Sequence, residues 1–256
     1  MPRCLRLLVE YDGSGFAGWA VQPGLRTVEG TLSEALSRLL REEVRLSVAG
    51  RTDAGVHASG QVASLQTQST LPTERILRAL AGMLPGDVGV RAVDDAPQGF
   101  DARRDAVARR YEYRVLVAPA PSPLRRGRVL WQPGPLDRDA LDAAAALVTG
   151  QHDFRAFTPT RTEHVFFHRT VTDCRWEARG DELVLALEAD AFLRHMVRVL
   201  VGTMLLVGRG VWPPSRLGTI LMGAPRGAAG PTAPAHPLTL VGVRYPPSGD
   251  GPTPGL

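Results

Sequence analysis

The segment EVRLSVAGRTDAGVHASGQVASLQTQ, residues 43–68, shows how this chain is built. Two stretches typical of β-strands, residues 43–50 and 61–68, flank a loop that holds glycines around an arginine, an aspartate and a histidine. Glycines let a bulky ligand approach the backbone, and loops on a rigid sheet often carry function. The spacing alone leaves Asp53 equally open to the role of an ordinary turn residue.

Helical and strand patterns alternate on both sides of this segment. The first half predicts a strand at residues 5–11, helices at 28–41 and 73–83, and strands at 88–93 and 108–117. The second half predicts a helix at 136–148, strands at 170–177 and 183–189, helices at 192–207 and 212–222, and a strand at 238–245. Both halves therefore have the order β-α-β-β-α-β.

This repeated order predicts an α+β fold. We expect two split βαβ lobes of the ferredoxin or RRM kind, with mainly antiparallel sheets and an active-site cleft between the lobes. The stretch 118–128 is rich in proline and arginine, so we expect an N-terminal lobe at residues 1–118 and a C-terminal lobe at 119–246. The tail, residues 247–256, is expected to be disordered.

Composition excludes several classes of protein. The apolar runs are too short to span a membrane, and the N-terminus lacks a signal-peptide core, so we expect a cytoplasmic protein. Cys4 and Cys174 offer no disulfide framework and no CxxC metal pair. All 30 basic residues of the Lys+Arg count are arginines, which excludes a lysine Schiff base. The net charge of +4 weakly favours a nucleic-acid partner.

Two motif-like patterns are better explained without a ligand. Residues 13–18 begin a GxGxxG pattern after a strand, but Pro23 prevents the helix that a dinucleotide site requires. Residues 163–168 spell EHxxxH, yet a strand there would present two histidines without a third ligand. We therefore expect no metal site and no dinucleotide.

Residues 50–62, GRTDAGVHASGQV, closely resemble the catalytic segment of the TruA family of tRNA pseudouridine synthases. Further family signatures occur in the right order over residues 3–246. They are YDGSGFAGW (11–19), LPGD (84–87), FDAR (100–103), ARRYEY (108–113), HDF (152–154), AFLRHMVR (191–198) and APAHPLTLVGVRY (233–245).

The resemblance implies an isomerase that converts uridine to pseudouridine at positions 38, 39 and 40 of the tRNA anticodon stem-loop. Members of the family are homodimers and need no cofactor. The resemblance also implies that Asp53 is the essential catalytic carboxylate, that Arg198 pairs with it, and that Tyr111 lines the uracil pocket. Arg51 and Arg103 match family positions associated with the active site and with RNA.

The reaction suits these residue types. The N1 glycosidic bond must break and the base must rejoin the ribose through C5, which needs no redox or energy input. A carboxylate can act in this reaction only when it is ionised, and a nearby arginine favours that form. We expect Arg198 on the helix at 192–207, on the same face as Arg194. The residues leave open whether Asp53 adds to the base, attacks C1′ of the ribose or abstracts a sugar proton.

The strand at 108–117 carries further candidates. Tyr111 and Tyr113 alternate, so both rings point to one face, either as core packing or with one ring stacked on a flipped uracil. Arg109 and Arg110 belong to an arginine cluster that fits RNA phosphates, the alternative being a solvated charged surface. His57 is a candidate general base, but a histidine in such a loop can instead hold backbone groups in place.

The sequence departs from the family pattern at Ala20, Glu29 and Pro237, which bears on RNA contacts and substrate range more than on the reaction. Two other classes of function are disfavoured. A noncatalytic RNA-binding protein on the same scaffold does not require the intact GRTDAG segment. A dinucleotide-dependent oxidoreductase rests only on the glycine pattern rejected above.

Overall fold

The computed structural model describes residues 2–162 and 164–246. The strands are β1 (Arg3–Tyr11), β2 (Ser47–Val48), β3 (His57–Thr67), β4 (Val88–Ala96), β5 (Ala108–Val117), β6 (Leu130–Gln132), β7 (Gly150–Asp153), β8 (His168–Arg179), β9 (Glu182–Ala189) and β10 (Leu238–Arg244). The α-helices are α1 (Val28–Leu40), α2 (Thr73–Met83), α3 (Arg138–Val148), α4 (Met196–Gly208) and α5 (Ser215–Leu221). Short 3-10 helices are η1 (Gly13–Gly15), η2 (Pro123–Arg125), η3 (Arg155–Phe157) and η4 (Arg226–Ala228). The tail expected to be disordered, residues 247–256, lies outside the described residues.

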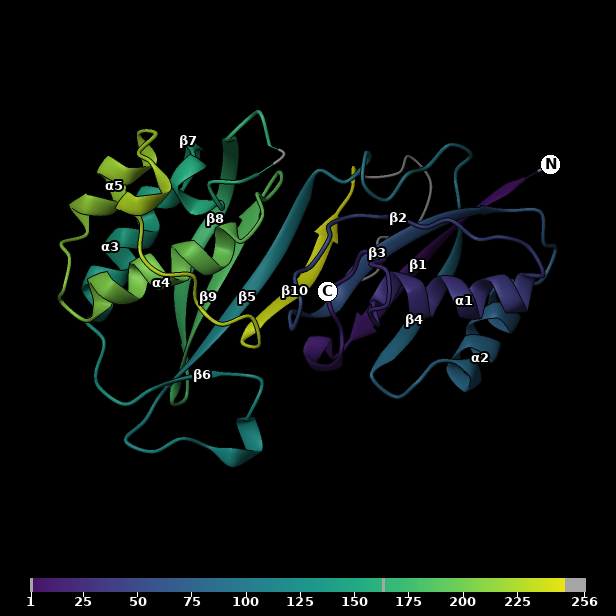
Figure 1. Ribbon diagram of the computed structural model, residues 1–256, viewed down its shortest axis with the longest axis horizontal. Coiled ribbons are helices and arrows are strands. Elements are labelled where there is room, and N and C mark those ends of the chain that lie inside the picture. Colours follow the sequence, from purple (N-terminus) through teal and green to yellow (C-terminus); the bar gives the residue numbers. More distant parts are fainter. Residues whose placement is uncertain (1, 163, 247–256) are drawn as a thin grey trace.

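The strands form one ten-stranded sheet in the order β4-β1-β3-β10-β5-β9-β8-β7, with β2 beside β3 and β6 beside β5. The pairs are antiparallel except for β10 with β3 and β6 with β5. The predicted α+β class with mainly antiparallel strands is therefore confirmed. The two lobes share this sheet instead of each having its own, because β10 pairs with β3 on one side and β5 on the other (Figure 1).

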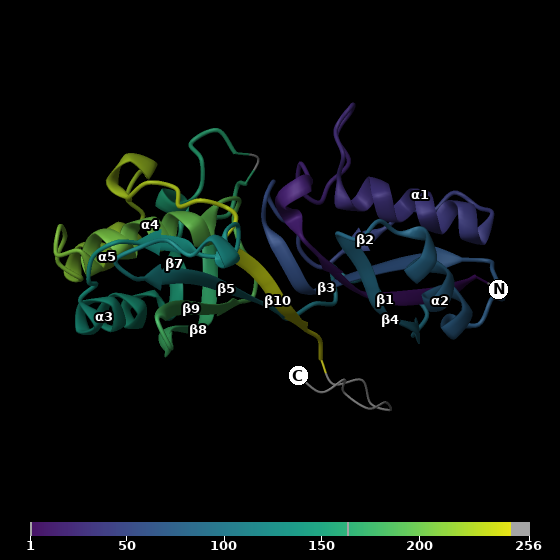
Figure 2. The same ribbon diagram turned by 90° about the horizontal axis from the view of Figure 1, so that it is seen from below.

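The helices form two groups, α1 and α2 in the first lobe and α3, α4 and α5 in the second, with β10 crossing between them (Figure 2). Helix α1 shows why such a segment is helical and packs on the sheet. Thr27 caps it by accepting from the Gly30 N–H, and its apolar stripe buries Leu32 and Leu36 completely. Buried apolar residues of both lobes belong to one continuous core. The lobes are thus held together by packing as well as by the shared sheet.

Two element boundaries affect the site. Helix α4 begins at Met196, not at residue 192, because the backbone of His195 is left-handed, with φ of 63°. Arg194 therefore precedes the helix, and the expectation that it shares a helix face with Arg198 is wrong. Strand β3 begins at His57, not at residue 61, so the loop before it is short.

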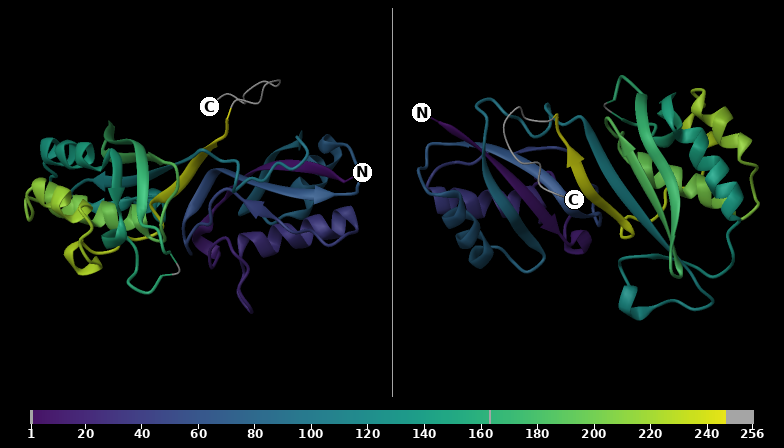
Figure 3. Two further views of the ribbon diagram at one scale, coloured as in Figure 1. Left: turned by 90° about the horizontal axis from the view of Figure 1, so that it is seen from above. Right: turned by 180° about the vertical axis from the view of Figure 1, so that it is seen from behind.

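This loop, residues 49–56, lies where the lobes meet. The first residues of β3 pair in parallel with β10, Thr239 opposite His57 and Leu240 opposite Ala58. On its other side β10 pairs with β5, and the two strands run side by side through the middle of the molecule (Figure 3). A residue in the loop is therefore within reach of side chains from both lobes.

Candidate active site

The backbone around Asp53 is held on both sides. The Trp19 N–H donates to the Thr52 carbonyl over 3.0 Å, and the Thr52 hydroxyl lies 2.7 Å from the Tyr11 phenol oxygen. After Asp53 the chain turns back at once, since the Val56 N–H donates to the Asp53 carbonyl over 3.1 Å. These contacts fix the direction in which the Asp53 side chain leaves the loop.

Two glycines make this arrangement possible. Gly55 has φ of +79°, which most side chains disfavour, and it completes the turn after Asp53. Gly18 touches the loop so closely that a Cβ there would lie 2.9 Å from the Thr52 carbonyl oxygen. The glycine-rich loop and the YDGSGFAGW segment therefore pack directly on each other.

The Asp53 carboxylate is paired with an arginine from the second lobe. Arg198 Nη1 lies 3.0 Å from Asp53 Oδ2, and the two side chains are 17% and 27% exposed. Arg198 is itself held, because its Nε donates to the Ala233 carbonyl over 2.8 Å while the Ala233 N–H donates to the Arg198 carbonyl over 3.0 Å. Both charged groups are thus oriented before any ligand binds, and Asp53 does not point into packed hydrocarbon.

His195 was not among the residues selected from the sequence, although it lies within the AFLRHMVR segment. Its Nε2 is 3.6 Å from Asp53 Oδ2. Burial lowers the pKa of His195, Arg198 and other arginines lower it further, and the Asp53 charge opposes them. The only signal in the sequence was the position of this histidine three residues before Arg198.

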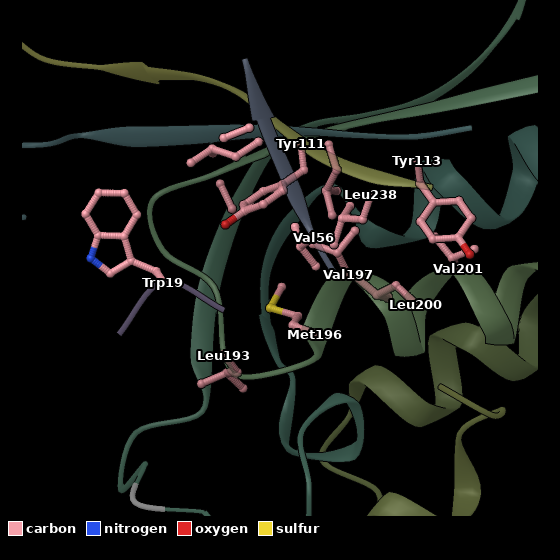
Figure 4. Packing of buried hydrophobic residues seen from close by; sticks show 14 of the residues in the cluster. Trp19, Val56, Tyr111, Tyr113, Leu193, Met196, Val197, Leu200, Val201 and Leu238 are labelled. Atoms are coloured by element: carbon pink, nitrogen blue, oxygen red, sulfur yellow. The ribbon is translucent and has the colours of Figure 1, made fainter. Parts of the chain in front are cut away.

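Tyr111 and Tyr113 point to one side of β5, as alternation predicts, but their surroundings differ (Figure 4). Tyr113 is fully buried and its hydroxyl donates to the Pro234 carbonyl over 3.1 Å, so it is a packing residue. Tyr111 is also buried, at 6% exposed, and its ring stands edge-on to Phe192, with centroids 5.0 Å apart. Burial raises the pKa of Tyr111, and the nearby Asp53 charge adds to the effect, so the phenol is neutral.

Arg109 is buried and bonded to main-chain carbonyls. Its Nε and Nη2 donate to the Ala49 carbonyl over 2.9 and 2.8 Å. Its Nη1 donates to the Ala106 and Asp190 carbonyls over 3.0 and 2.7 Å, and Nη2 also donates to the Arg103 carbonyl over 2.8 Å. All five N–H donors of a guanidinium are used by these bonds. No donor remains for the phosphate contact expected of Arg109, whose surroundings point to a structural role.

The other arginines selected from the sequence are placed differently. Arg51 and Arg103 are exposed, and their guanidinium groups have no partner among the described residues. Arg110 lies opposite Glu188 in the sheet register. Burial raises the pKa of Glu188, hydrogen bonds from Arg244 and Thr172 lower it, and the charge of Arg110 adds a smaller lowering. Neighbouring residues of a strand face opposite ways, so Arg110 points to the face of the sheet away from Tyr111.

The comparison with protein families decides what kind of site this is. The family model described as "tRNA pseudouridine synthase" matches residues 7–104 and 144–246, which include Asp53 and Arg198. The chain belongs to the tRNA pseudouridine synthase family.

Curated relatives of this family match nearly the whole chain. A tRNA pseudouridine synthase A of Frankia casuarinae is 48% identical over 95% of this chain and 89% of its own length. The protein of the same name from Chloroflexus aurantiacus is 45% identical over 96% of this chain and 90% of its own. Among solved structures, a chain of a Cbf5-Nop10-Gar1 complex aligns with 92% of this chain and over 57% of its own length, at 13% identity and a TM-score of 0.38.

In this member of the family the His57 ring is bonded to main-chain groups. Its Nδ1 accepts from the Gly13 N–H over 3.0 Å, and its Nε2 lies 3.0 Å from the Gly127 carbonyl and 2.9 Å from that of His236. The side chain is only 2% exposed. Since both ring nitrogens bond to the main chain, the ring ties the loop of Asp53 to the second lobe.

Hollows of about 380 and 410 Å³ lie beside α5 and beside Asp12, and Asp53 lines neither, so a cleft around Asp53 stays a prediction.

Residues 13–15, where the GxGxxG pattern begins, form the short helix η1, and no α-helix begins there. Within residues 2–162 and 164–246, no group of three or more His, Cys, Asp or Glu is placed to hold a metal ion. Glu163 of the EHxxxH pattern lies outside these residues. The described helices include none long and apolar enough to cross a bilayer.

Proposed function

We propose that this chain isomerises uridine to pseudouridine at positions 38, 39 and 40 of the tRNA anticodon stem-loop, with Asp53 as the catalytic carboxylate. The observation that carries the proposal is the 3.0 Å ion pair between Asp53 and Arg198, formed across the two lobes in a chain of this family. The relatives are named for pseudouridine synthesis in tRNA. The choice of the anticodon positions rests on the resemblance of residues 50–62.

The two carboxylate oxygens of Asp53 have different tasks in this proposal. Oδ2 receives the Arg198 guanidinium, whereas Oδ1 has no hydrogen-bond partner among the described residues. Oδ1 is therefore the oxygen free to react with the nucleoside. The carboxylate acts by addition to the base, by attack on C1′ of the ribose or by abstraction of a sugar proton, and in each case Arg198 holds it in position.

Tyr111 is proposed to line the uracil pocket. An enzyme that acts on N1 and C5 of uracil has to take the base out of its stack. An aromatic side chain offsets part of the unstacking free energy, by about 1–3 kcal/mol for a stacked base. The neutral phenol of Tyr111 suits a polar but uncharged base.

Arg51 and Arg103 are proposed to bind the RNA backbone, because both are exposed and uncommitted to protein partners. Phosphate contacts of this kind supply affinity and orientation without reading sequence. Arg110 and Arg109 were expected to join them. Arg110 can reach RNA only on the far face of the sheet, and Arg109 supports the site from within.

The proposal also covers oligomeric state, cellular location and cofactor. We propose a homodimer in the cytoplasm that works without a cofactor, as the family resemblance implies. The division into lobes at residue 118 stays a prediction. Strand β5 lies before this boundary in the chain, but its partners β9 and β10 both lie after it.

The test uses anticodon stem-loops that carry a single uridine at position 38, 39 or 40, labelled with tritium at C5. Rejoining through C5 displaces the label, so the expected result is tritium release from each of the three, with pseudouridine found at that position. A stem-loop with its uridine moved outside these positions is the control. Binding without release would favour the noncatalytic RNA-binding function, and release only from other positions would overturn the assignment of 38–40.

A further inference from the structure

His195 is the second titratable group beside the Asp53 carboxylate. Its Nε2 lies 3.6 Å from Oδ2, the oxygen already bonded to Arg198 at 3.0 Å. A separation of 3.6 Å is too long for a hydrogen bond, so Nε2 is not committed to Asp53. The His195 side chain is 24% exposed. An imidazole nitrogen is thus available within a few ångströms of the proposed reacting carboxylate.

The backbone of His195 is held in an unfavourable conformation. Its φ of 63° and ψ of 0° are left-handed, a region that residues with a Cβ rarely occupy. The residue stands directly before α4, whose first turn closes with the Val199 N–H on the His195 carbonyl over 3.0 Å. Strained residues of this kind persist only where the surrounding structure enforces them, and they cluster at functional sites. In this conformation His195 has its Nε2 3.6 Å from Asp53 Oδ2.

We propose that His195 accepts the proton that leaves C5 of the uracil after the base has rejoined the ribose. This inference rests on the proposed function. The requirement for a proton acceptor holds for each of the three routes open to Asp53, because every route ends with a C5–C1′ bond and a hydrogen still on C5.

The step balances without another reactant. Where Asp53 has added to the base, the bond between them breaks first and returns the carboxylate, so that each route reaches the same C6–N1 double bond. The C5–H bond breaks and its electron pair becomes the C5–C6 double bond. The pair of the former C6–N1 double bond moves to N1, which takes a proton from the imidazolium or from water. His195 Nε2 receives the C5 proton and is neutral again once the imidazolium has lost it, so the enzyme ends unchanged.

The charges around His195 suit a proton acceptor. Burial lowers the pKa of His195 most, the charge of Asp53 in the loop raises it, and the charges of Arg198 on α4, Arg194 before it and Arg226 on η4 lower it further. The net result is a pKa below the ordinary value, so the ring is neutral at neutral pH. A neutral imidazole can take a proton, and the neighbouring carboxylate then stabilises the imidazolium.

The test compares target uridines carrying hydrogen or deuterium at C5, in single-turnover reactions with tRNA. The variants are His195→Asn and His195→Gly, because asparagine and glycine both tolerate the left-handed backbone. The matched control is His152→Asn on β7, a histidine whose Nε2 lies 3.1 Å from the carbonyl of Thr149, the residue directly before that strand. We expect both His195 variants to fold and to react about 100-fold more slowly than the wild type, with a larger deuterium isotope effect. Added imidazole should restore part of the rate of His195→Gly, and His152→Asn should match the wild type.

The outcomes separate the inference from the proposed function. Wild-type protein that releases no label from tRNA would overturn both. Active wild type with His195 variants that keep their rate would overturn only the role of His195. A lowered rate with an unchanged isotope effect and no rescue by imidazole would likewise overturn it and leave a purely structural role.

Discussion

Arg198 Nη1 lies 3.0 Å from Oδ2 of Asp53, although 145 residues separate the two in the chain. The contact joins a loop of the first lobe to a helix of the second. Arg198 does not depend on Asp53 for its position, because its Nε is bonded to the Ala233 carbonyl. A guanidinium can make two such contacts in fixed directions, whereas a lysine ammonium on a flexible stem cannot hold the same geometry.

Replacing Arg198 by lysine is therefore expected to reduce turnover while leaving tRNA binding nearly unchanged. The positive charge remains, but a charge-assisted hydrogen bond worth about 1.5–3 kcal/mol is broken or misplaced, which corresponds to about 10- to 100-fold in kcat. Single-turnover kinetics and a binding titration measure the two effects separately. Arg138→Lys on α3, where the arginine pairs with Asp142, is the matched control. A wild-type kcat in Arg198→Lys would show that a positive charge at this position is enough for turnover, which would contradict the need for the guanidinium geometry.

Replacing Arg109 by methionine is expected to destabilise the fold. Five buried N–H groups bond to four carbonyls, and their removal leaves those carbonyls unpaired, at a loss of about 3 kcal/mol or more. For a chain of this size that loss lowers Tm by roughly 6–12 °C. Differential scanning calorimetry measures it. Unchanged Tm together with weakened tRNA binding would instead support the phosphate contact first expected of Arg109.

Replacing Arg103 by alanine is expected to weaken tRNA binding at low salt and to flatten the dependence of log K on log salt. The slope should fall by up to about one unit for each phosphate that the variant no longer neutralises. Arg51→Ala should behave in the same way. Binding titrations at several salt concentrations measure the slope, with the exposed Arg78 of α2 replaced by alanine as the control. A slope equal to that of the wild type would remove the phosphate assignment.

The stability of the protein is expected to fall steeply above about pH 10. Burial raises the pKa of all four tyrosines, that of Tyr11 to about 12. Above their ordinary pKa the unfolded chain loses protons that the folded chain keeps. The free energy of unfolding then decreases by up to about 1.4 kcal/mol per pH unit for each tyrosine. Urea unfolding between about pH 9 and 11 measures this. A free energy of unfolding that stays constant over this range would contradict it.

Local patterns in the sequence were enough for much of the fold. The period of α2 gave its bounds, Thr73–Met83, and the alternation of β5 put Tyr111 and Tyr113 on one face. Both features depend on neighbours in the chain. The family resemblance then named Asp53 and Arg198, which the fold brings together.

Features that depend on distant contacts could not be predicted in this way. A strand pattern does not reveal its partner, so the joining of two sheets through β10 was not foreseen. Arg109 looks like any other arginine in sequence, and only the carbonyls around it show that it is committed to the main chain. The left-handed backbone of His195 depends on its surroundings. The helical pattern of residues 192–207 runs through this residue without a sign of it, whereas α4 begins only at Met196.

The most direct test of the whole account is tritium release from C5-labelled tRNA by Asp53→Asn. Asparagine keeps the size of the side chain and removes its charge, and Asp142→Asn on the exposed face of α3 is the matched control. The account predicts no release by Asp53→Asn, tRNA affinity within about tenfold of the wild type, and full release by the control. Release by Asp53→Asn at a rate near that of the wild type would contradict the assignment of Asp53 as the catalytic carboxylate.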